Sequence, residues 1–303
     1  MKISNIKPLV SVVLGSYNRR AFLKATLESV RTNGQDFSYE IIVVDGGSTD
    51  GSMQFLAKQK DVITIIQHNR GEFRGKKIER RSWGYFMNLG FKAAQGKYIL
   101  MLSDDCLLVP GALKNGVTYF EELLSKGQKI GAMAFYWRNW PEEKEYYVGL
   151  ALGMKMFVNH GLYLRAALEE VGWIDEQTYQ FYYADSDLCL RLWKASYSVV
   201  DCKTAFVEHC SHVKPSPVPS NKAWEIYLKK WEGIYYDPQE KNDGGLICQS
   251  YIDPYKTYQN FPAFARAWIG LEKPLSFIKR IARATIQKIN RLVSPDTNNP
   301  PRQ

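Results

Sequence analysis

Continuous apolar segments alternate with helical patterns along the first hundred residues of this 303-residue chain. The apolar segments are residues 9–14, 40–45, 62–67 and 98–102. A helical spacing of apolar residues, as in residues 19–32, follows each of the first three segments. Strands that are apolar on both faces are typical of a parallel sheet covered by helices on both sides. The sequence therefore predicts an α/β protein with a mostly parallel, Rossmann-like sheet between two helical layers.

Polar motifs follow three of these predicted strands. They are SYN at 16–18, DGGSTDGS at 45–52 and SDDC at 103–106. In open parallel sheets, ligands bind beyond the carboxyl ends of the strands. We therefore expect the three motifs to converge on one ligand site.

The adjacent acids Asp104 and Asp105 need a compensating charge. Two neighbouring carboxylates repel each other unless a cation or ordered hydrogen bonds stabilise them. A hard divalent ion with oxygen ligands, Mg²⁺ or Mn²⁺, is the usual partner where phosphates are bound. The alternative is that the acids begin a helix before the PGAL segment, but Pro110 lies too far along the chain to explain both of them.

Asp45 ends a predicted strand and precedes two glycines. Its carboxylate can face a ligand that approaches the backbone closely, or it can be an ordinary turn acid. Both possibilities stay open at this stage. Ser48 and Asp50 are interpreted as capping residues of the next helix.

Asp185 is the candidate general base in the segment FYYADSDLCLRLW at 181–193. A hydroxyl group that acts as a nucleophile must lose its proton, and a carboxylate within hydrogen-bond reach can accept it. Asp187 and Arg191 are spaced i and i+4, and we interpret them as an ion pair on the same helix.

His209 and His212 lie three residues apart in the segment VEHCSH. Either side chain could complete a metal site, and a structural role is the alternative. Zinc binding with Cys210 is disfavoured, because no other ligand pair of matching spacing occurs in the chain.

A basic segment at 68–81, HNRGEFRGKKIERR, lies between a predicted strand and a helix. Its arginines, Arg81 among them, could clamp a diphosphate. A solvated run of charges is the alternative.

The net charge of +9 favours anionic partners, but no recognition motif for nucleic acid accompanies it, so no nucleic-acid partner is expected. Five cysteines without a C-x-x-C pair suggest reduced thiols. No run approaches the roughly 18 apolar residues of a membrane span, and the first residues lack the apolar core of a signal peptide. A cytoplasmic protein is expected.

The segment 273–293 is rich in Lys and Arg, carries no acid, and places isoleucines and leucines near one helical face. Such a helix could lie on the inner face of a membrane as a peripheral contact. It could equally pack onto the rest of the protein or a partner.

In order and spacing, the motifs resemble those of the family 2 glycosyltransferases, which are inverting enzymes of the GT-A fold. The resemblance is carried by VSVVLGSYNR, EIIVVDGGSTDGS, NLGFKAAQGKYILMLSDDCLLVPGAL, GWIDE, and FYYADSDLCLRLW followed by VEH. It implies a GT-A catalytic domain at 1–213, divided into a donor half at 1–105 and an acceptor half at 106–213. A loop and a helical C-terminal extension would occupy 214–303.

The resemblance also assigns roles to residues. Ser16 and Tyr17 would border the nucleotide, Asp45 would bind the base, Asp104 would lie near the ribose and diphosphate, Asp105 and His209 would bind Mn²⁺ or Mg²⁺, and Asp185 would be the base. Two departures stand out, because Ser103 replaces a common Asp and Ala184 replaces a common Glu.

The function that the resemblance implies is transfer of a sugar from a nucleoside diphosphate donor, a UDP-sugar, to a saccharide or lipid-linked acceptor. Such enzymes build cell-surface polysaccharide, lipopolysaccharide or other glycoconjugates. The alternative is a catalytically inactive module that binds nucleotide sugars or serves in interactions.

Overall fold

The computed structural model describes residues 7–210, 221–240 and 243–267. The strands are β1 (Val10–Ser16), β2 (Tyr39–Asp45), β3 (Val62–Ile66), β4 (Glu72–Phe73), β5 (Lys76–Lys77), β6 (Tyr98–Ser103), β7 (Cys106–Leu108), β8 (Ile130–Trp140), β9 (Tyr146–Leu150), β10 (Gly161–Leu164), β11 (Ser198–Cys210) and β12 (Gly245–Gln249). The α-helices are α1 (Arg20–Asn33), α2 (Ser52–Leu56), α3 (Trp83–Ala93), α4 (Ala112–Ser125), α5 (Arg165–Glu170), α6 (Ala184–Lys194) and α7 (Asn221–Trp231). Short 3-10 helices lie at Leu152–Met154 and Thr257–Asn260. All of these elements belong to the unit Met1–Phe261, and Pro262–Gln303 form a separate unit.

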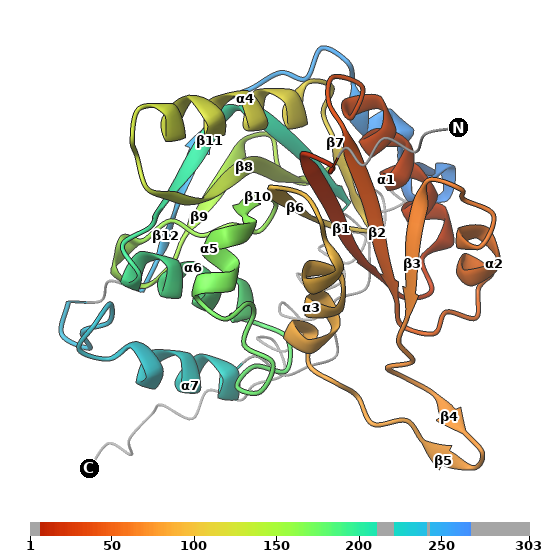
Figure 1. The fold of residues 1–303 in the computed structure, drawn as a ribbon, viewed down its shortest axis with the longest axis horizontal. Coiled ribbons are helices and arrows are strands. Elements are labelled where there is room, and N and C mark those ends of the chain that lie inside the picture. Colours follow the sequence, from red (N-terminus) through yellow and green to blue (C-terminus); the bar gives the residue numbers. More distant parts are fainter. Residues whose placement is uncertain (1–6, 211–220, 241–242, 268–303) are drawn as a thin grey trace, which may run out of the picture. The chain divides into compact units, whose positions relative to one another are not determined.

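One large sheet runs through the first unit in the order β12-β9-β8-β10-β6-β1-β2-β3 (Figure 1). The four strands predicted from the apolar segments are β1, β2, β3 and β6, and they are parallel neighbours. Beyond β6 the direction changes, because β10 is antiparallel to both β6 and β8. β11 runs parallel to β8 and antiparallel to β7.

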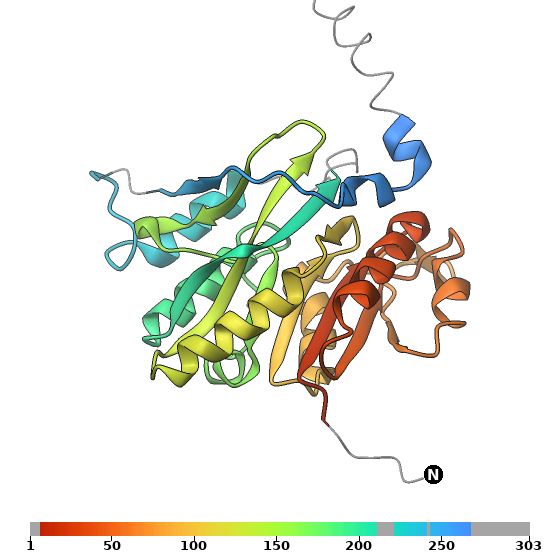
Figure 2. The ribbon, with the colours of Figure 1, turned by 90° about the horizontal axis from the view of Figure 1, so that it is seen from above.

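The alternation of side chains along β1 explains why helices cover both faces of the sheet. Val12 and Leu14 belong to a core that α1 and α4 cover, whereas Val13 belongs to a second core with α3, α5 and α6. Because successive strand residues point to opposite faces, a fully apolar strand supplies both cores. The α/β/α layering predicted from the sequence is therefore confirmed, and Figure 2 shows α1 and α4 on one side of the sheet.

The region predicted as a helical C-terminal extension contains the helix α7. The basic segment at 68–81 instead contains a two-stranded hairpin, β4–β5, which extends away from the sheet in Figure 1. The predicted loop around 215–220 and the helix at 275–293 lie outside the described residues.

The capping interpretation of Ser48 is wrong. The N-cap position of α2 is Gly51, and α2 begins only at Ser52. Asp50 does assist helix starts, because its carboxylate accepts hydrogen bonds from Ser52 N at 3.0 Å and from Arg20 N at 2.8 Å. These backbone groups lack partners within their own helices, which an acidic side chain can supply.

None of the five cysteines forms a disulfide. Cys248 is exposed and the other four are buried. Within the described part of the chain, every helix is too short or too polar to cross a membrane.

Candidate active site

The loops after β1 and β2 are joined by hydrogen bonds. Asp45 is fully buried, and its carboxylate accepts hydrogen bonds from Gly47 N at 2.9 Å and from Ser48 N and Oγ, both at 2.7 Å. The Ser48 hydroxyl accepts in turn from Asn18 N at 2.8 Å, and Asn18 Oδ1 accepts from Thr49 N at 2.7 Å. The first two polar motifs therefore meet, as expected. In this state Asp45 organises its own loop, and its role toward a base stays a prediction.

Tyr17 lies where the loops after β1, β2 and β3 come together. Its ring lies so close to Gly46 that a Cβ there would come within 3.0 Å of it. The Arg70 guanidinium lies over the same ring, 4.9 Å from its centroid. Burial and the nearby charge of Arg70 lower the pKa of Arg80. Two guanidinium groups of the basic segment therefore lie near one another at this edge, an arrangement that favours an anion.

Arg81 occupies the end of the basic segment next to α3. Its backbone is held by Asn69, whose Oδ1 accepts from Arg81 N at 2.5 Å, and by Gln180, whose Nε2 donates to Arg81 O at 3.2 Å. The exposed guanidinium lies over the Tyr85 ring, 5.5 Å from its centroid. The role of Arg81 toward a diphosphate stays a prediction.

The acid pair Asp104 and Asp105 forms the turn between β6 and β7, and both residues are buried. The backbone of this turn is fixed by buried Thr26 of α1, whose hydroxyl shares its one proton between Asp104 O at 3.0 Å and Cys106 O at 2.8 Å. Arg19, directly before α1, places Nη1 at 2.9 Å from Asp104 Oδ1 and 2.8 Å from Asp105 Oδ2. The compensating charge that the acid pair requires is thus present in the chain itself, and sequence reasoning missed it.

The pKa values of the two carboxyl groups are shifted in opposite directions. Burial and the Asp105 charge raise the pKa of Asp104 to about 6, although Arg19 opposes the shift. Burial also disfavours ionised Asp105, but His209 and Arg19 outweigh that effect and lower its pKa. The Ser16 hydroxyl near Asp104 helps to lower the pKa of Asp104, yet Ser16 Oγ and Asp104 Oδ2 lie buried without a well-formed hydrogen bond to any described residue. Buried polar atoms without partners are rare, and these two indicate a place for a bound group.

His209, near the end of β11, lies opposite Cys106 of β7 and reaches the acid pair. The Asn139 amide donates to Glu143 Oε1 at 3.1 Å, so its oxygen must face His209 Nδ1, which lies 2.7 Å away. Nδ1 therefore carries a proton. Nε2 faces Asp105 Oδ1 at 3.6 Å; it donates toward this carboxylate when the ring is protonated and carries a lone pair when the ring is neutral. A hydrogen bond of this kind fixes the tautomer of many metal-binding histidines.

One cluster of potential metal ligands within the described residues consists of Asp105, Cys106 and His209, whose ligand atoms lie within 4.8 Å of one another. Burial and Asp105 raise the pKa of the Cys106 thiol well above its usual value, so it stays protonated and is a poor ligand. Its sulfur instead contacts buried His160, with Nε2 at 3.5 Å. Burial and then His209 lower the pKa of His160 to about 3, so this ring is neutral. His212 lies outside the described residues.

Asp185 lies in the first turn of α6. Its carboxylate accepts hydrogen bonds from Ser186 N at 2.9 Å and from Asn159 Nδ2 at 3.2 Å, and burial raises its pKa. Asn159 is followed directly by His160, which contacts Cys106 next to the acid pair. The dipeptide 159–160 thus connects Asp185 with the acid pair, although no sequence motif marks it.

The ion pair predicted between Asp187 and Arg191 is confirmed, with Oδ2 3.0 Å from Nε. Asp187 is fully buried, and it also accepts hydrogen bonds from Tyr179 Oη at 3.1 Å and Trp231 Nε1 at 3.0 Å. Lys230 Nζ lies 2.8 Å from the same carboxylate. Asp187 therefore joins α7 to the helix that carries Asp185.

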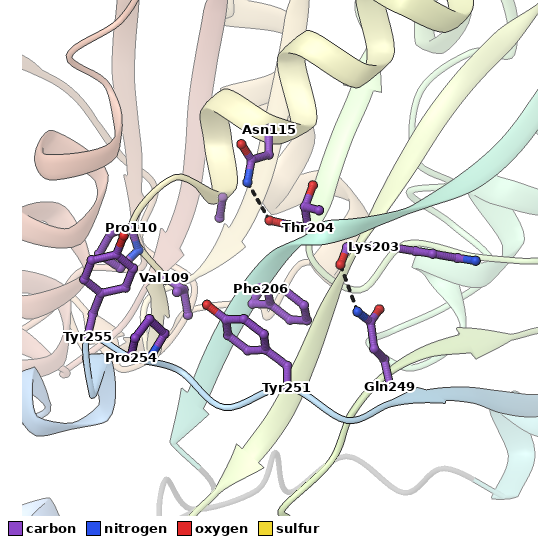
Figure 3. A pocket seen from close by; sticks show the side chains of 11 residues that line it. Val109, Pro110, Asn115, Lys203, Thr204, Phe206, Gln249, Tyr251, Pro254 and Tyr255 are labelled. Carbon is purple, nitrogen blue, oxygen red and sulfur yellow. Dashed lines mark hydrogen bonds between the residues drawn. The ribbon is translucent and has the colours of Figure 1, made fainter.

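A pocket of about 330 Å³ lies elsewhere on the unit, between the start of α4, β11 and the segment after β12 (Figure 3). Its lining includes Asn115 and Gln249, which donate hydrogen bonds to the backbone oxygens of Thr204 and Lys203. Tyr251, also in the lining, stacks on Phe206 with ring centroids 3.8 Å apart. None of the predicted site residues lines this pocket, so its size carries no weight in locating the active site.

Residues 11–154 match the family model described as Glycosyl transferase family 2. The matched segment, just under half of the chain, therefore belongs to this family. Its relatives include TuaG of Bacillus subtilis, provisionally named as a teichuronic acid biosynthesis glycosyltransferase, which is 32% identical over 34% of this chain and 38% of its own length. The chondroitin synthase of Escherichia coli is 28% identical over 40% of this chain and 16% of its own length. The chain thus spans less than half of each of these relatives.

Solved structures support the predicted fold of this chain. Residues 1–349 of Staphylococcus aureus TarS superpose with a TM-score of 0.52 at 14% identity, covering 73% of this chain and 69% of that one. The same protein in complex with UDP-GlcNAc gives a TM-score of 0.54 at 16% identity, covering 73% and 64%. At identities this low, the structural similarity is evidence for the fold alone, and it confirms the predicted GT-A fold.

Proposed function

We propose that this family 2 glycosyltransferase transfers a sugar from a UDP-sugar donor to an acceptor hydroxyl, with inversion at the anomeric carbon and with help from a divalent metal. The observation that carries the proposal is the buried acid pair Asp104 and Asp105, compensated by Arg19 and faced by His209. Similar proteins support the substrate class, because one was solved with UDP-GlcNAc and others are named for teichuronic acid and chondroitin synthesis. We therefore propose a role in polysaccharide or other glycoconjugate synthesis.

The residues at the acid pair fit a hard divalent ion such as Mn²⁺ or Mg²⁺. Asp105 would offer a carboxylate oxygen and His209 the lone pair of Nε2, whereas Asp104 lies outside the cluster of ligand atoms that are within 4.8 Å of one another. When bound, the ion would supply positive charge to the departing diphosphate. Ser103 contributes no carboxylate here, so the chain brings fewer acidic ligands than an Asp at that position would give.

Asp185 is proposed to accept the proton of the acceptor hydroxyl. Asn159 and the backbone of Ser186 hold its carboxylate in one orientation. The raised pKa makes the ionised carboxylate a stronger base. Since Ala184 leaves it without an acidic neighbour, no like charge assists this shift.

We also propose the remaining contacts with the donor. Ser16 and Tyr17 border the nucleotide, Asp45 recognises the base, and Arg81 contacts the diphosphate. On this view residues 1–105 form the donor half, residues 106–213 the acceptor half, and 214–303 an extension of the catalytic domain.

The test compares Asp185→Asn with Asp36→Asn. Asp36 is exposed and pairs with Lys114 at 3.2 Å, so removal of its charge should cost about 0.5 kcal/mol or less. With Mn²⁺, a donor found by thermal-shift screening of sugar nucleotides and a productive acceptor, Asp185→Asn should lose about 100-fold or more in turnover while donor binding is retained. The Asp36 variant should match the wild type. Full activity of Asp185→Asn would refute the assignment of the base, and donor binding without turnover by the wild type across a broad acceptor panel would favour the inactive binding module.

A further inference from the structure

The proposed function gives Arg19 a role toward the acid pair but none toward the donor. A single nitrogen, Nη1, contacts both carboxylates of the acid pair, at 2.9 and 2.8 Å. The carboxylates are buried, whereas the Arg19 side chain is 32% exposed. The guanidinium therefore covers the acid pair on its solvent side, in the part of the site that a donor must approach.

The other edge of the guanidinium is open. Among the described residues no partner is found for Nε or Nη2 of Arg19, although Nη1 makes both of its contacts. An arginine presents its five N–H groups as a planar fork that matches phosphate oxygens. Arg19 can thus keep Nη1 on the acid pair while Nη2 and Nε bind an anion.

A divalent ion on Asp105 would share that carboxylate with the guanidinium. Asp105 Oδ2 contacts Arg19, and Oδ1 faces His209 Nε2 at 3.6 Å. A metal bound there alone would lie close to a fixed positive charge and would be repelled. The non-bridging oxygens of a diphosphate, which share at least two negative charges, reduce that repulsion because they can contact both cations.

We propose that Arg19 is a second cation of the donor site that couples metal binding to nucleotide binding. Without donor it compensates the acid pair and opposes the metal. With donor it binds the diphosphate alongside the metal. Metal and nucleotide then bind cooperatively, and thermodynamic linkage requires each to strengthen the other by the same factor. This inference rests on the proposed function, since it assumes that the acid pair serves a nucleoside diphosphate.

Arg20 provides a matched control. It is exposed, its guanidinium lies against Gly51 of the loop after β2, and the described structure gives it no contact with the acid pair. Arg19→Gln and Arg20→Gln remove the same charge one residue apart. Only the first removes a group that contacts Asp104 and Asp105.

The experiment measures binding of Mn²⁺ alone, UDP alone in the presence of EDTA, and Mn²⁺ at saturating UDP, for the full chain and both variants. We expect UDP to tighten Mn²⁺ binding by the wild type by at least about tenfold, a coupling of about 1.4 kcal/mol. Arg19→Gln should bind Mn²⁺ alone about tenfold more tightly, bind UDP alone about tenfold more weakly, and lose most of the coupling. Arg20→Gln should behave as the wild type. Melting temperatures provide a second measurement, because Mn²⁺ alone should stabilise Arg19→Gln more than the wild type.

The outcomes separate the two proposals. If the wild type binds Mn²⁺ and UDP cooperatively and Arg19→Gln does the same, the role of Arg19 is wrong and the proposed function stands. Equal changes in both arginine variants would mean that general charge is responsible, and would also overturn the role of Arg19. If no protein binds Mn²⁺ with or without UDP, the metal-assisted function fails and this inference fails with it.

Discussion

Removal of the Asp187 carboxylate should destabilise the fold far more than removal of an exposed carboxylate with a similar partner. Asp187 is fully buried and has four partners, two of them cations. Breaking a buried ion pair typically costs about 3–5 kcal/mol, because it leaves an uncompensated charge. Here Lys230 keeps a second carboxylate at 3.0 Å, and Arg191 keeps two backbone oxygens at 2.6 Å, which reduces that cost.

The neutral donors add to the loss. Trp231 Nε1 would lose its acceptor at 3.0 Å, and a buried donor left without a partner costs about 1–3 kcal/mol. We expect Asp187→Ala to lower the free energy of unfolding by about 4 kcal/mol. Asp187→Asn retains an acceptor oxygen and should lower it by about 2 kcal/mol.

Urea unfolding measures both values, with Asp61→Ala as the matched control. Asp61 makes a bidentate pair with Arg31, with both contacts at 2.8 Å, but its side chain is 50% exposed. Its removal should cost about 1 kcal/mol or less. If Asp187→Ala lost no more stability than Asp61→Ala at an unchanged denaturant slope, the buried network would be a minor contributor and this reasoning would be refuted.

Three further predictions concern packing, pH and the C-terminal segment. A methyl group at Gly90 of α3 would lie 2.5 Å from Val13 of β1. Gly90→Ala should therefore lower the free energy of unfolding in urea by about 1–3 kcal/mol. An unchanged free energy of unfolding would mean that α3 can shift away from the sheet. Burial opposes ionisation of Asp175, but hydrogen bonds from Thr178 and Gln177 and the Lys230 contact outweigh that effect and lower the pKa of Asp175. An acid whose pKa is lowered by folding stabilises the fold at pH values above its unfolded-state pKa, near 3.8 here, and loses that contribution as the pH falls below it. The stability difference between the wild type and Asp175→Asn should therefore shrink as the pH is lowered from about 5 to about 3, and a difference that stays constant would contradict the pKa direction. Liposomes with anionic lipid should carry the full chain in flotation but not a chain without residues 273–303, and equal flotation of the two would remove the proposed peripheral membrane contact.

The parallel half of the sheet was predictable because its information is local. Each of its strands is apolar over its own length, and Asp45 and Asp104 follow directly at strand ends. The β4–β5 hairpin was also open to prediction, because Gly75 is a typical residue of a two-residue turn of the mirror-image type. The structure has the positive φ values that such a turn requires at both Arg74 and Gly75. The charges around that turn led us to predict a diphosphate-binding loop instead.

The contacts that complete the site join residues far apart in the chain. Arg19 reaches Asp104 across 85 positions, and the Asp187 carboxylate reaches Trp231 across 44. Spacing rules identified only the local part of the second network, the i,i+4 pair with Arg191. An arginine directly after the SYN motif was visible, but nothing in one sequence says which carboxylate it will meet.

The reversal of direction at β10 explains why an unmarked dipeptide lies in the site. In a parallel sheet, loops at the carboxyl ends come after strands, and sequence reasoning searched for polar residues in those positions. β10 is antiparallel to β6, with Gly161 opposite Met101 near the end of β6, so the residues that precede β10 lie at the same edge. Those residues are Asn159 and His160, and they contact Asp185 and Cys106. In a sheet of mixed direction, the residues before an antiparallel strand therefore belong to the ligand-binding edge as much as the residues after a parallel one.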